Sequence, residues 1–267
     1  MPSPDANLQH HPCFPQPKEP KEWVWRYIDF PKLVWALTHN ELVLTRLNTL
    51  DDKREGRHGK HFARAVYLSA MGRMKIANDP ASHDERERRA IDEANLARES
   101  EERNRAASFV SCWCLGEHKE SEAMWQIYAK RGASVALVLP YERLRDSLKG
   151  TELLIGVVTY FDFNRGVMPE GNVFRATMCK GHEYEHEHEV RIVKHVPSIW
   201  SGDKVPPGVP SIENPPGVLT IPWVIADHVE RIVISPYAAR WQADAIGSVI
   251  ARLSPGLEAR ISESEMT

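Results

Sequence analysis

Residues 134–139, SVALVL, form an apolar and partly β-branched run in the middle of the chain. Residues 153–163, LLIGVVTYFDF, have the same character, and the stretch between the two runs, 141–148, has the spacing of a short helix. Apolar, β-branched runs of this length favour strands that are buried in a sheet. We therefore expect two central strands with a short helix between them.

Further strands and helices are expected on both sides of this centre. Short alternating or apolar runs predict strands at 23–28, 41–47, 109–114, 186–193 and 229–234. Helical spacing predicts helices at 31–40, 121–129 and 238–253, and the highly charged residues 57–107 are also expected to be helical. This order predicts an α+β fold: a mixed, mainly antiparallel central sheet with flanking helices and a charged helical insertion.

The chain of 267 residues is long enough to bury one full core. We expect a single domain at 21–256, which includes the helical insertion 57–107 and a proline-rich loop at 200–222. Residues 1–20 are rich in proline and polar residues, so we expect a disordered tail there, and a second tail at 257–267.

The composition excludes several classes of protein. The formal net charge of −3 gives no overall attraction to nucleic acid or to an acidic membrane, although a local basic patch stays compatible with it. Four cysteines are too few for a disulfide framework, and no signal peptide or membrane segment is visible. We expect a cytoplasmic protein without membrane contact.

The most informative polar segment is GHEYEHEHEVRIV, residues 181–193. If its second half is a strand, Glu187, Glu189 and Arg191 share one face. Two neighbouring carboxylates disfavour joint ionisation, which is how a site prepares an acid, a base or a stabiliser of positive charge. An edge strand that carries charge to prevent aggregation explains the same pattern about equally well.

Other side chains allow both a functional and a structural interpretation. His182, His186 and His188 could hold a metal, but no HExxH pair exists, and no metal is expected. Cys112 and Cys114 are expected to pack in a strand. Trp125 and Tyr128 share a helix face, where they could form core packing or stack on a nucleotide.

Five short motifs in this order resemble the bacterial family catalogued as domain of unknown function 2971. The motifs are Trp25-Arg26-Tyr27, the loop from Asn48 through Asp51-Asp52 to Glu55-Gly56, Ser111-Cys112-Trp113, Met124-Trp125 with Tyr128, and Tyr184 with Glu187-His188-Glu189-Val190-Arg191. The resemblance spans about residues 23–235. Asp52-Lys53 stands where the family has aspartate-proline, and Val190 stands where an aromatic residue is common.

An arginine, a serine and a glutamate-x-glutamate on successive strands also resemble the arginine-serine-glutamate ADP-ribosyltransferases. This likeness implies that Arg26 binds NAD phosphates, Ser111 holds the nicotinamide ribose, Glu189 stabilises the oxocarbenium-like transition state, and Glu187 prepares the acceptor. It also implies an ADP-ribosyltransferase-like fold. The residues expected to contact the nucleotide are Arg26, Tyr27, Ser111, Trp113, Trp125, Tyr128 and Arg191.

The leading hypothesis is therefore an NAD-dependent ADP-ribosyltransferase-like enzyme, such as a toxin or a phage-defence effector, with NAD as substrate and a macromolecule as acceptor. One alternative is a non-catalytic module that binds a nucleotide or a protein. Another is a metal-dependent hydrolase or nuclease that uses the histidine and glutamate tract. The charged segment 82–105 could pair with a partner helix, so an oligomer stays open.

Overall fold

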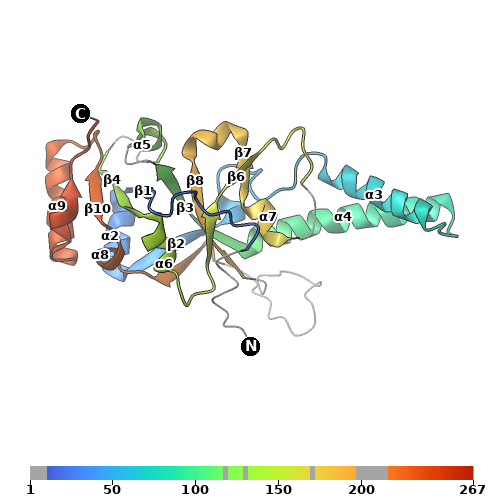
Figure 1. Ribbon diagram of the computed structural model, residues 1–267, viewed down its shortest axis with the longest axis horizontal. Coiled ribbons are helices and arrows are strands. Elements are labelled where there is room, and N and C mark those ends of the chain that lie inside the picture. Colours follow the sequence, from blue (N-terminus) through green and yellow to red (C-terminus); the bar gives the residue numbers. More distant parts are fainter. Residues whose placement is uncertain (1–10, 117–119, 129–131, 169–171, 197–215, 267) are drawn as a thin grey trace.

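The apolar run at 134–139 forms β4 (Ser134–Pro140), a central strand of a nine-stranded sheet. Figure 1 shows the computed structural model, which describes residues 11–116, 120–128, 132–168, 172–196 and 216–266. β4 pairs antiparallel with β1 (Trp23–Asp29) on one side and with β10 (Arg231–Ile234) on the other. The structure confirms the predicted α+β class with a mainly antiparallel sheet and flanking helices.

The sheet forks at β3 (Ser108–Gly116). One edge of β3 pairs with β8 (Glu189–His195), which also pairs with β5 (Leu154–Val157). The other edge pairs with β1 at residues 23–25 and then with β2 (Glu41–Arg46) at residues 45–46. Beyond these short contacts β1 turns to β4 and β2 turns to β9 (Val218–Pro222), so the two strands separate.

The helix α2 (Phe30–His39) connects the two strands of the fork. Asp29 caps its first turn by accepting a hydrogen bond from the Lys32 N–H at 2.9 Å, and Asn40 ends it in the left-handed conformation. Leu33 and Leu37 lie one turn apart and are buried against the sheet, each contributing about 1.5–3 kcal/mol. The helix therefore covers the face of the sheet on which the fork opens.

The remaining helices lie on both faces and at both ends of the sheet. They are α5 (Glu122–Tyr128), α6 (Tyr141–Asp146), α7 (Val173–Thr177), α8 (Ile225–His228) and α9 (Arg240–Leu253). Apolar residues of α2, α6, α8 and α9 join the main core, whereas Met124 and Trp125 of α5 pack with Trp25 and Tyr27 in a second core. α5 thus covers the opposite face from α2. None of the described helices combines the length and the apolar character needed to cross a lipid bilayer.

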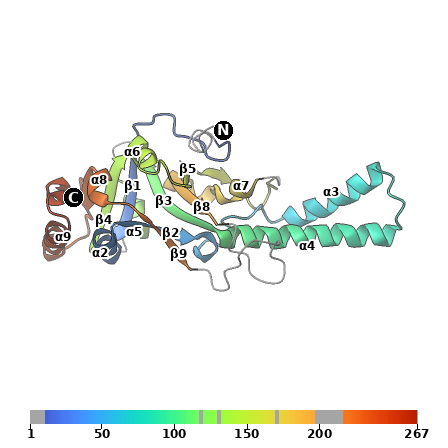
Figure 2. The same ribbon diagram turned by 90° about the horizontal axis from the view of Figure 1, so that it is seen from below.

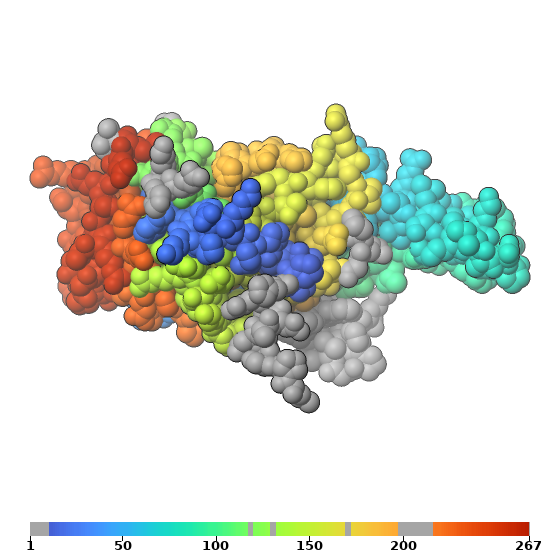
Figure 3. All heavy atoms as spheres, viewed as in Figure 1, coloured from blue at the N-terminus to red at the C-terminus, as the bar shows by residue number. Residues whose placement is uncertain are grey.

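The charged insertion is a helical hairpin of α3 (Phe62–Ile76) and α4 (His83–Ala107). It projects from the end of the sheet that lies farthest from α9, as Figures 1 to 3 show. Its base is fixed by two buried charged side chains of α4. Arg105 donates to the Glu55 carbonyl at 2.8 Å, and Glu101 accepts from the His58 backbone at 2.7 Å.

The expected N-terminal tail is wrong for its described part, residues 11–20. Phe14 is 3% exposed, and the Val157 N–H donates to the Pro15 carbonyl at 2.7 Å. The Gln16 amide also donates to the Ile155 carbonyl at 2.9 Å. These contacts cover the free edge of β5, whose backbone groups would otherwise lack a partner on that side.

Three other sequence expectations need correction. The run at 153–163 is not one central strand, because it divides into β5 at the sheet edge and β6 (Thr159–Phe161), which pairs with β7 (Cys179–Gly181) in a separate two-stranded sheet. The predicted loop at 200–222 ends in β9, and its residues 200–215 lie outside the described part. The expected C-terminal tail forms a 3-10 turn, η3 (Leu257–Arg260), and β11 (Ile261–Ser262), which pairs parallel with β10.

Candidate functional site

The predicted site residues lie on two opposite faces of the sheet. In the β3–β8 ladder Glu189 lies opposite Cys114, and in the β1–β3 ladder Cys114 lies opposite Trp25. Paired residues share a face and consecutive residues alternate, so Arg26 lies on the other face from Trp25 and Glu189. The structure therefore does not bring Arg26 and Glu189 into one pocket, as the ADP-ribosyltransferase mapping expects.

On the α5 face, three carboxylates and two cations form a buried cluster, which we call the acid cluster. Its members are Glu55, Lys180, Glu187, Glu189 and Arg191, all with side chains at most 6% exposed.

The Lys180 ammonium is the centre of the acid cluster. Its Nζ lies 2.8 Å from a Glu187 oxygen, 3.0 Å from a Glu189 oxygen and 3.7 Å from a Glu55 oxygen. Arg191 donates to the other oxygens of Glu189 and Glu55 at 2.7 and 2.6 Å, and to the Thr177 carbonyl at 2.6 Å. Each carboxylate of this set thus faces a cation, as buried charges require.

The two predicted acids meet by a route other than a shared strand face. Residues 182–187 form a 3-10 helix, η2 (His182–Glu187), and His188 is left-handed with φ 43°, so β8 begins only at Glu189. The expected strand at 186–193 is therefore wrong at its start. Glu187 and Glu189 nevertheless converge, because Lys180 of β7 lies between them.

The charges of the acid cluster shift the pKa values of its members in different directions. Burial favours the neutral form of Glu189, but Arg191 and Lys180 outweigh it and lower the pKa of Glu189 to about 2. For Glu55 burial dominates over Arg191, and its pKa is raised. Glu189 is thus ionised at neutral pH. As the pH falls, Glu55 is protonated before Glu189, because its pKa is raised and that of Glu189 is lowered.

Tyrosines close the acid cluster on its outer side. The Tyr128 hydroxyl donates to Glu187 at 2.9 Å, and burial raises the pKa of Tyr128. The Tyr160 hydroxyl accepts from the Glu189 backbone N–H at 2.8 Å, and the Lys180 ammonium lies 4.9 Å from the centre of the Tyr184 ring. With its acids paired and covered, the acid cluster mainly joins the loop before α3, β7, η2 and β8.

The other aromatic residues of the α5 face are part of the core. Trp125 is fully buried and donates to Glu120 at 3.0 Å, and Tyr27 contacts its ring edge-to-face at 4.7 Å between centroids. The Tyr27 hydroxyl accepts from the Ser121 backbone N–H at 3.2 Å. Both rings are buried against other side chains of the protein, so neither has an exposed face on which a nucleotide base could stack.

Arg26, Ser111 and Trp113 lie together on the opposite face, at the fork. The Arg26 guanidinium carbon lies 5.5 Å from the centre of the Trp113 ring, and the Trp113 indole N–H donates to the Ser111 hydroxyl at 3.2 Å. Arg26 also donates to the Val43 carbonyl across the fork at 3.0 Å. The structure thus assembles the predicted site residues in two separate groups: these three at the fork, and Glu187, Glu189, Arg191 and Tyr128 in or beside the acid cluster.

Arg26 contributes to a cavity of about 360 Å³ between β1, β2, β9 and α2, which we call the fork groove. Its deeply buried lining is apolar and consists of Ile28, Leu42, Leu137, Trp223 and Ile225. Its rim is more exposed and includes Lys32, Trp35, Val218 and Thr220. A concave, mostly apolar cavity with a few polar groups is the usual form of a small-molecule site, for which about 300–1,000 Å³ is typical.

The guanidinium of Arg26 has no carboxylate partner among the described residues. Its one hydrogen bond there is to Val43, although a guanidinium carries five N–H donors. Burial lowers the pKa of Arg26 to about 10, and the interaction that opposes this shift comes from the Cys112 thiol, not from a carboxylate. Arg26 is thus a positive charge that faces an apolar cavity with most of its donors available.

Sequence reasoning missed several residues that build these two sites. Glu55 was part of a recognised motif, but its 136-residue separation from Arg191 hides their contact. Lys180 stands alone between Cys179 and Gly181 and gives no periodic signal. Trp35 lies in an expected helix and Trp223 directly follows the expected loop at 200–222, so their positions on the two sides of the fork groove follow only from the pairing of β2 with β9.

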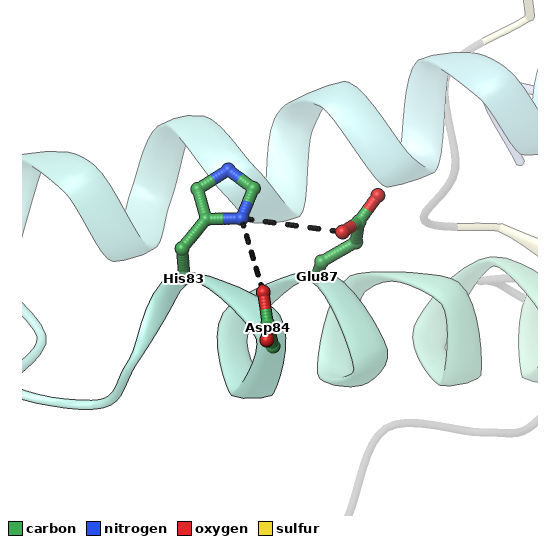
Figure 4. Close-up of side chains that lie close together, drawn as sticks. All are labelled: His83, Asp84 and Glu87. Atoms are coloured by element: carbon green, nitrogen blue, oxygen red, sulfur yellow. Dashed lines mark ion pairs between the residues drawn. The ribbon is translucent and has the colours of Figure 1, made fainter.

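The structure does not gather the histidines of the predicted metal tract. His182, His186 and His188 are exposed on and after η2. Among the described residues, ligand atoms come together instead at His83, Asp84 and Glu87, at the start of α4 (Figure 4). These three side chains are exposed, and the His83 ring nitrogen lies 3.9 Å from Asp84 and 4.0 Å from Glu87. Such exposed groups are common on charged helices, so they carry no functional assignment.

Comparison with known proteins assigns no family to the chain. No family model matches the chain, and neither a curated protein nor a solved structure is significantly similar to it.

Proposed function

We propose that this chain is a ligand-binding protein that holds a small organic anion in the fork groove. The observation that supports this most directly is the guanidinium of Arg26, which faces an apolar cavity without a carboxylate partner among the described residues. The Arg26 side chain is half-buried and most of its N–H donors are unused, so a ligand anion in the groove would supply a partner for them.

A purely structural role explains less of this arrangement. Capping the Val43 carbonyl needs one N–H, which a neutral glutamine could supply without burying a charge. Stacking on Trp113 is compatible with either role, since a cation over an indole contributes about 0.5–2 kcal/mol. The unused donors of Arg26 and the adjacent cavity therefore favour a binding role.

Transfer of ADP-ribose from NAD stays an untested prediction, and the geometry gives it little support. That mapping needs an arginine, a serine and a glutamate that reach one nucleotide. Arg26 and Ser111 belong to the fork, whereas Glu189 lies on the other face of the sheet and is bound to Lys180 and Arg191.

A thermal-shift screen of wild type and Arg26→Met tests the proposed function. The panel contains small carboxylates, sulfonates, phosphate monoesters, nucleotides and NAD. We expect at least one class of anion to raise the Tm of the wild type and not of the variant, because a ligand at 100 times its Kd adds about 2.7 kcal/mol of stability. Trp241→Ala, on the exposed side of α9, is the control that should respond like the wild type. If no anion stabilises the wild type more than Arg26→Met, the proposed function is wrong.

A further inference from the structure

The charge balance of the fork groove indicates which kind of anion fits it. Near the floor Arg26 contributes one positive charge, and its neighbours there are apolar. At the rim Lys32 is already paired with Asp29 at 3.0 Å, and Glu41 adds one negative charge. The groove thus has one guanidinium without a carboxylate partner, and the second cation among the described residues that line it, Lys32, is already paired at the rim.

A single guanidinium in an apolar cavity matches a single negative charge. A carboxylate accepts two parallel N–H bonds from the guanidinium fork, and these bonds neutralise it completely. A phosphate monoester carries nearly two negative charges at neutral pH, so one of them would be buried without a partner, which is costly. The charge balance therefore favours a monoanion over a nucleotide or another phosphate ester.

The gradient of burial along the groove indicates how such a ligand lies. Leu42, Leu137 and Ile225 on the floor are at most 2% exposed, whereas Trp35 on the rim is 44% exposed. The indole N–H of Trp223 at the floor and that of Trp113 beside Arg26 are already used, since Trp113 donates to Ser111 and Trp223 donates to Ser147. Arg26 is then the side chain near the floor that can donate hydrogen bonds to a ligand. The body of the ligand would contact aromatic ring faces and aliphatic side chains.

We infer that the fork groove binds a small monocarboxylate with an apolar or aromatic body, with its carboxylate on Arg26 and its body directed toward Trp35. This inference rests on the proposed function and adds the chemical class of the ligand and its orientation.

Matched probes test the inference by titration calorimetry at neutral pH. The carboxylates are 4-phenylbutyrate, octanoate and indole-3-propionate. 4-Phenylbutan-1-ol and 4-phenylbutyl phosphate keep one of these bodies and replace the head group by a neutral and a dianionic one. We expect at least one carboxylate to bind to the wild type and to lose tenfold or more in affinity in Arg26→Met. We also expect 4-phenylbutyrate to bind at least tenfold more tightly than 4-phenylbutan-1-ol and 4-phenylbutyl phosphate.

A second measurement on the wild type does not depend on a variant that folds. In NMR spectra the indole N–H signals of Trp113 and Trp223, at the fork groove, should shift when a carboxylate binds. Those of Trp25 and Trp125 lie on the other face of the sheet and should not, which makes them an internal control. Shifts confined to the second pair would overturn the assignment of the site.

The remaining outcomes separate the inference from the proposed function. If the phosphate ester binds more tightly than the carboxylates and depends on Arg26, the fork groove is an anion site but the monocarboxylate class is wrong. If the neutral alcohol binds as tightly as 4-phenylbutyrate, the head-group assignment is wrong. If none of the probes binds in a way that depends on Arg26 or shifts Trp113 and Trp223, the monocarboxylate inference is wrong, and the anion panel alone decides the proposed function.

Discussion

Glu55 and Arg191 are joined by a 2.6 Å hydrogen bond between side chains that are at most 5% exposed and 136 residues apart in the chain. This ion pair fixes the loop before the α3–α4 hairpin to β8, and so it joins the projecting hairpin to the central sheet. Because Arg191 also binds Glu189, and Glu189 binds Lys180, removal of one member leaves its buried partners with fewer opposite charges.

We expect Lys180→Met to be among the most destabilising single changes on this face. It removes the ammonium that faces Glu55, Glu187 and Glu189 while nearly keeping the side-chain volume, and three buried carboxylates lose a cation. Breaking a buried ion pair in this way costs about 3–5 kcal/mol. Urea denaturation measures the loss, and Lys149→Met, whose pair with Asp146 is exposed, is the control that should change by less than about 1 kcal/mol. A loss below about 1 kcal/mol for Lys180→Met would contradict the account of the acid cluster.

Arg26→Met should have the opposite effect from Lys180→Met. Both changes replace a cation by methionine, but Arg26 is only half-buried and has no carboxylate partner among the described residues. Removing a half-buried cation that has no carboxylate partner leaves no acid unpaired, so we expect the free energy of unfolding without ligand to stay unchanged or to rise, by up to about 2 kcal/mol. Urea denaturation of both variants tests this contrast. A loss of more than about 2 kcal/mol in Arg26→Met would indicate that the guanidinium is there for stability.

The directions of the pKa shifts in the acid cluster predict that, at neutral pH, Glu189→Gln lowers the free energy of unfolding more than Glu55→Gln does. The pKa of Glu189 is about 2 in the folded state, below the usual value of about 4.3, so its contribution is present above pH 4.3 and is lost as the pH falls toward 2. This contribution is on the order of 3 kcal/mol. The raised pKa of Glu55 has the opposite sign, because the folded state favours the protonated acid that glutamine imitates.

Denaturation of both variants and the wild type between pH 7 and pH 3 measures this difference. Glu189→Gln should flatten the loss of stability on the acid side, and Glu55→Gln should leave that loss in place. Equal costs at pH 7 for the two variants, with the same pH dependence, would contradict the assignment of the ionised acid.

The sequence predicts which side chains of one strand share a face. It does not predict which side chains of neighbouring strands lie on the same face. The pattern correctly separates Arg26 from Trp25 and Tyr27, and it predicts that β4 is buried. Whether Arg26 shares a face with Glu189 depends on the registers of β1 with β3 and of β3 with β8, and these are set by contacts between distant segments.

The position of Lys180 illustrates what local patterns leave out. Its neighbours in sequence give no periodic or motif signal, and its role depends on η2 folding back so that Glu187 reaches it. The left-handed His188 makes this return possible, and histidine is not a residue whose presence alone predicts that conformation. Propensity therefore predicted a continuous strand where the chain turns.

The packing of the N-terminal segment predicts that Gly156→Ala is destabilising. A Cβ at this position would lie 2.8 Å from backbone atoms of Phe14, and backbone atoms cannot rotate away as a side-chain end can. Overpacking of this kind costs about 1–3 kcal/mol. Gly72→Ala is the matched control, because a Cβ there meets nothing within 4 Å and alanine favours the helix by about 0.5–1 kcal/mol. Thermal denaturation should lower the Tm of the first variant and not of the second.

The separation of Arg26 from Glu189 by the sheet gives the ADP-ribosyltransferase hypothesis a sharp test. One NAD molecule that reached both residues would make Arg26→Met and Glu189→Gln each abolish nicotinamide release, with no further loss in the double variant, since groups that act on one substrate are not additive. From the registers we expect no such joint dependence: any NAD consumption by the wild type should survive at least one of the two changes. Nicotinamide release from NAD measures this, with circular dichroism to confirm that each variant is folded. Loss of activity in both folded variants would mean that the chain rearranges to bring the two faces together, and it would return the catalytic hypothesis to first place.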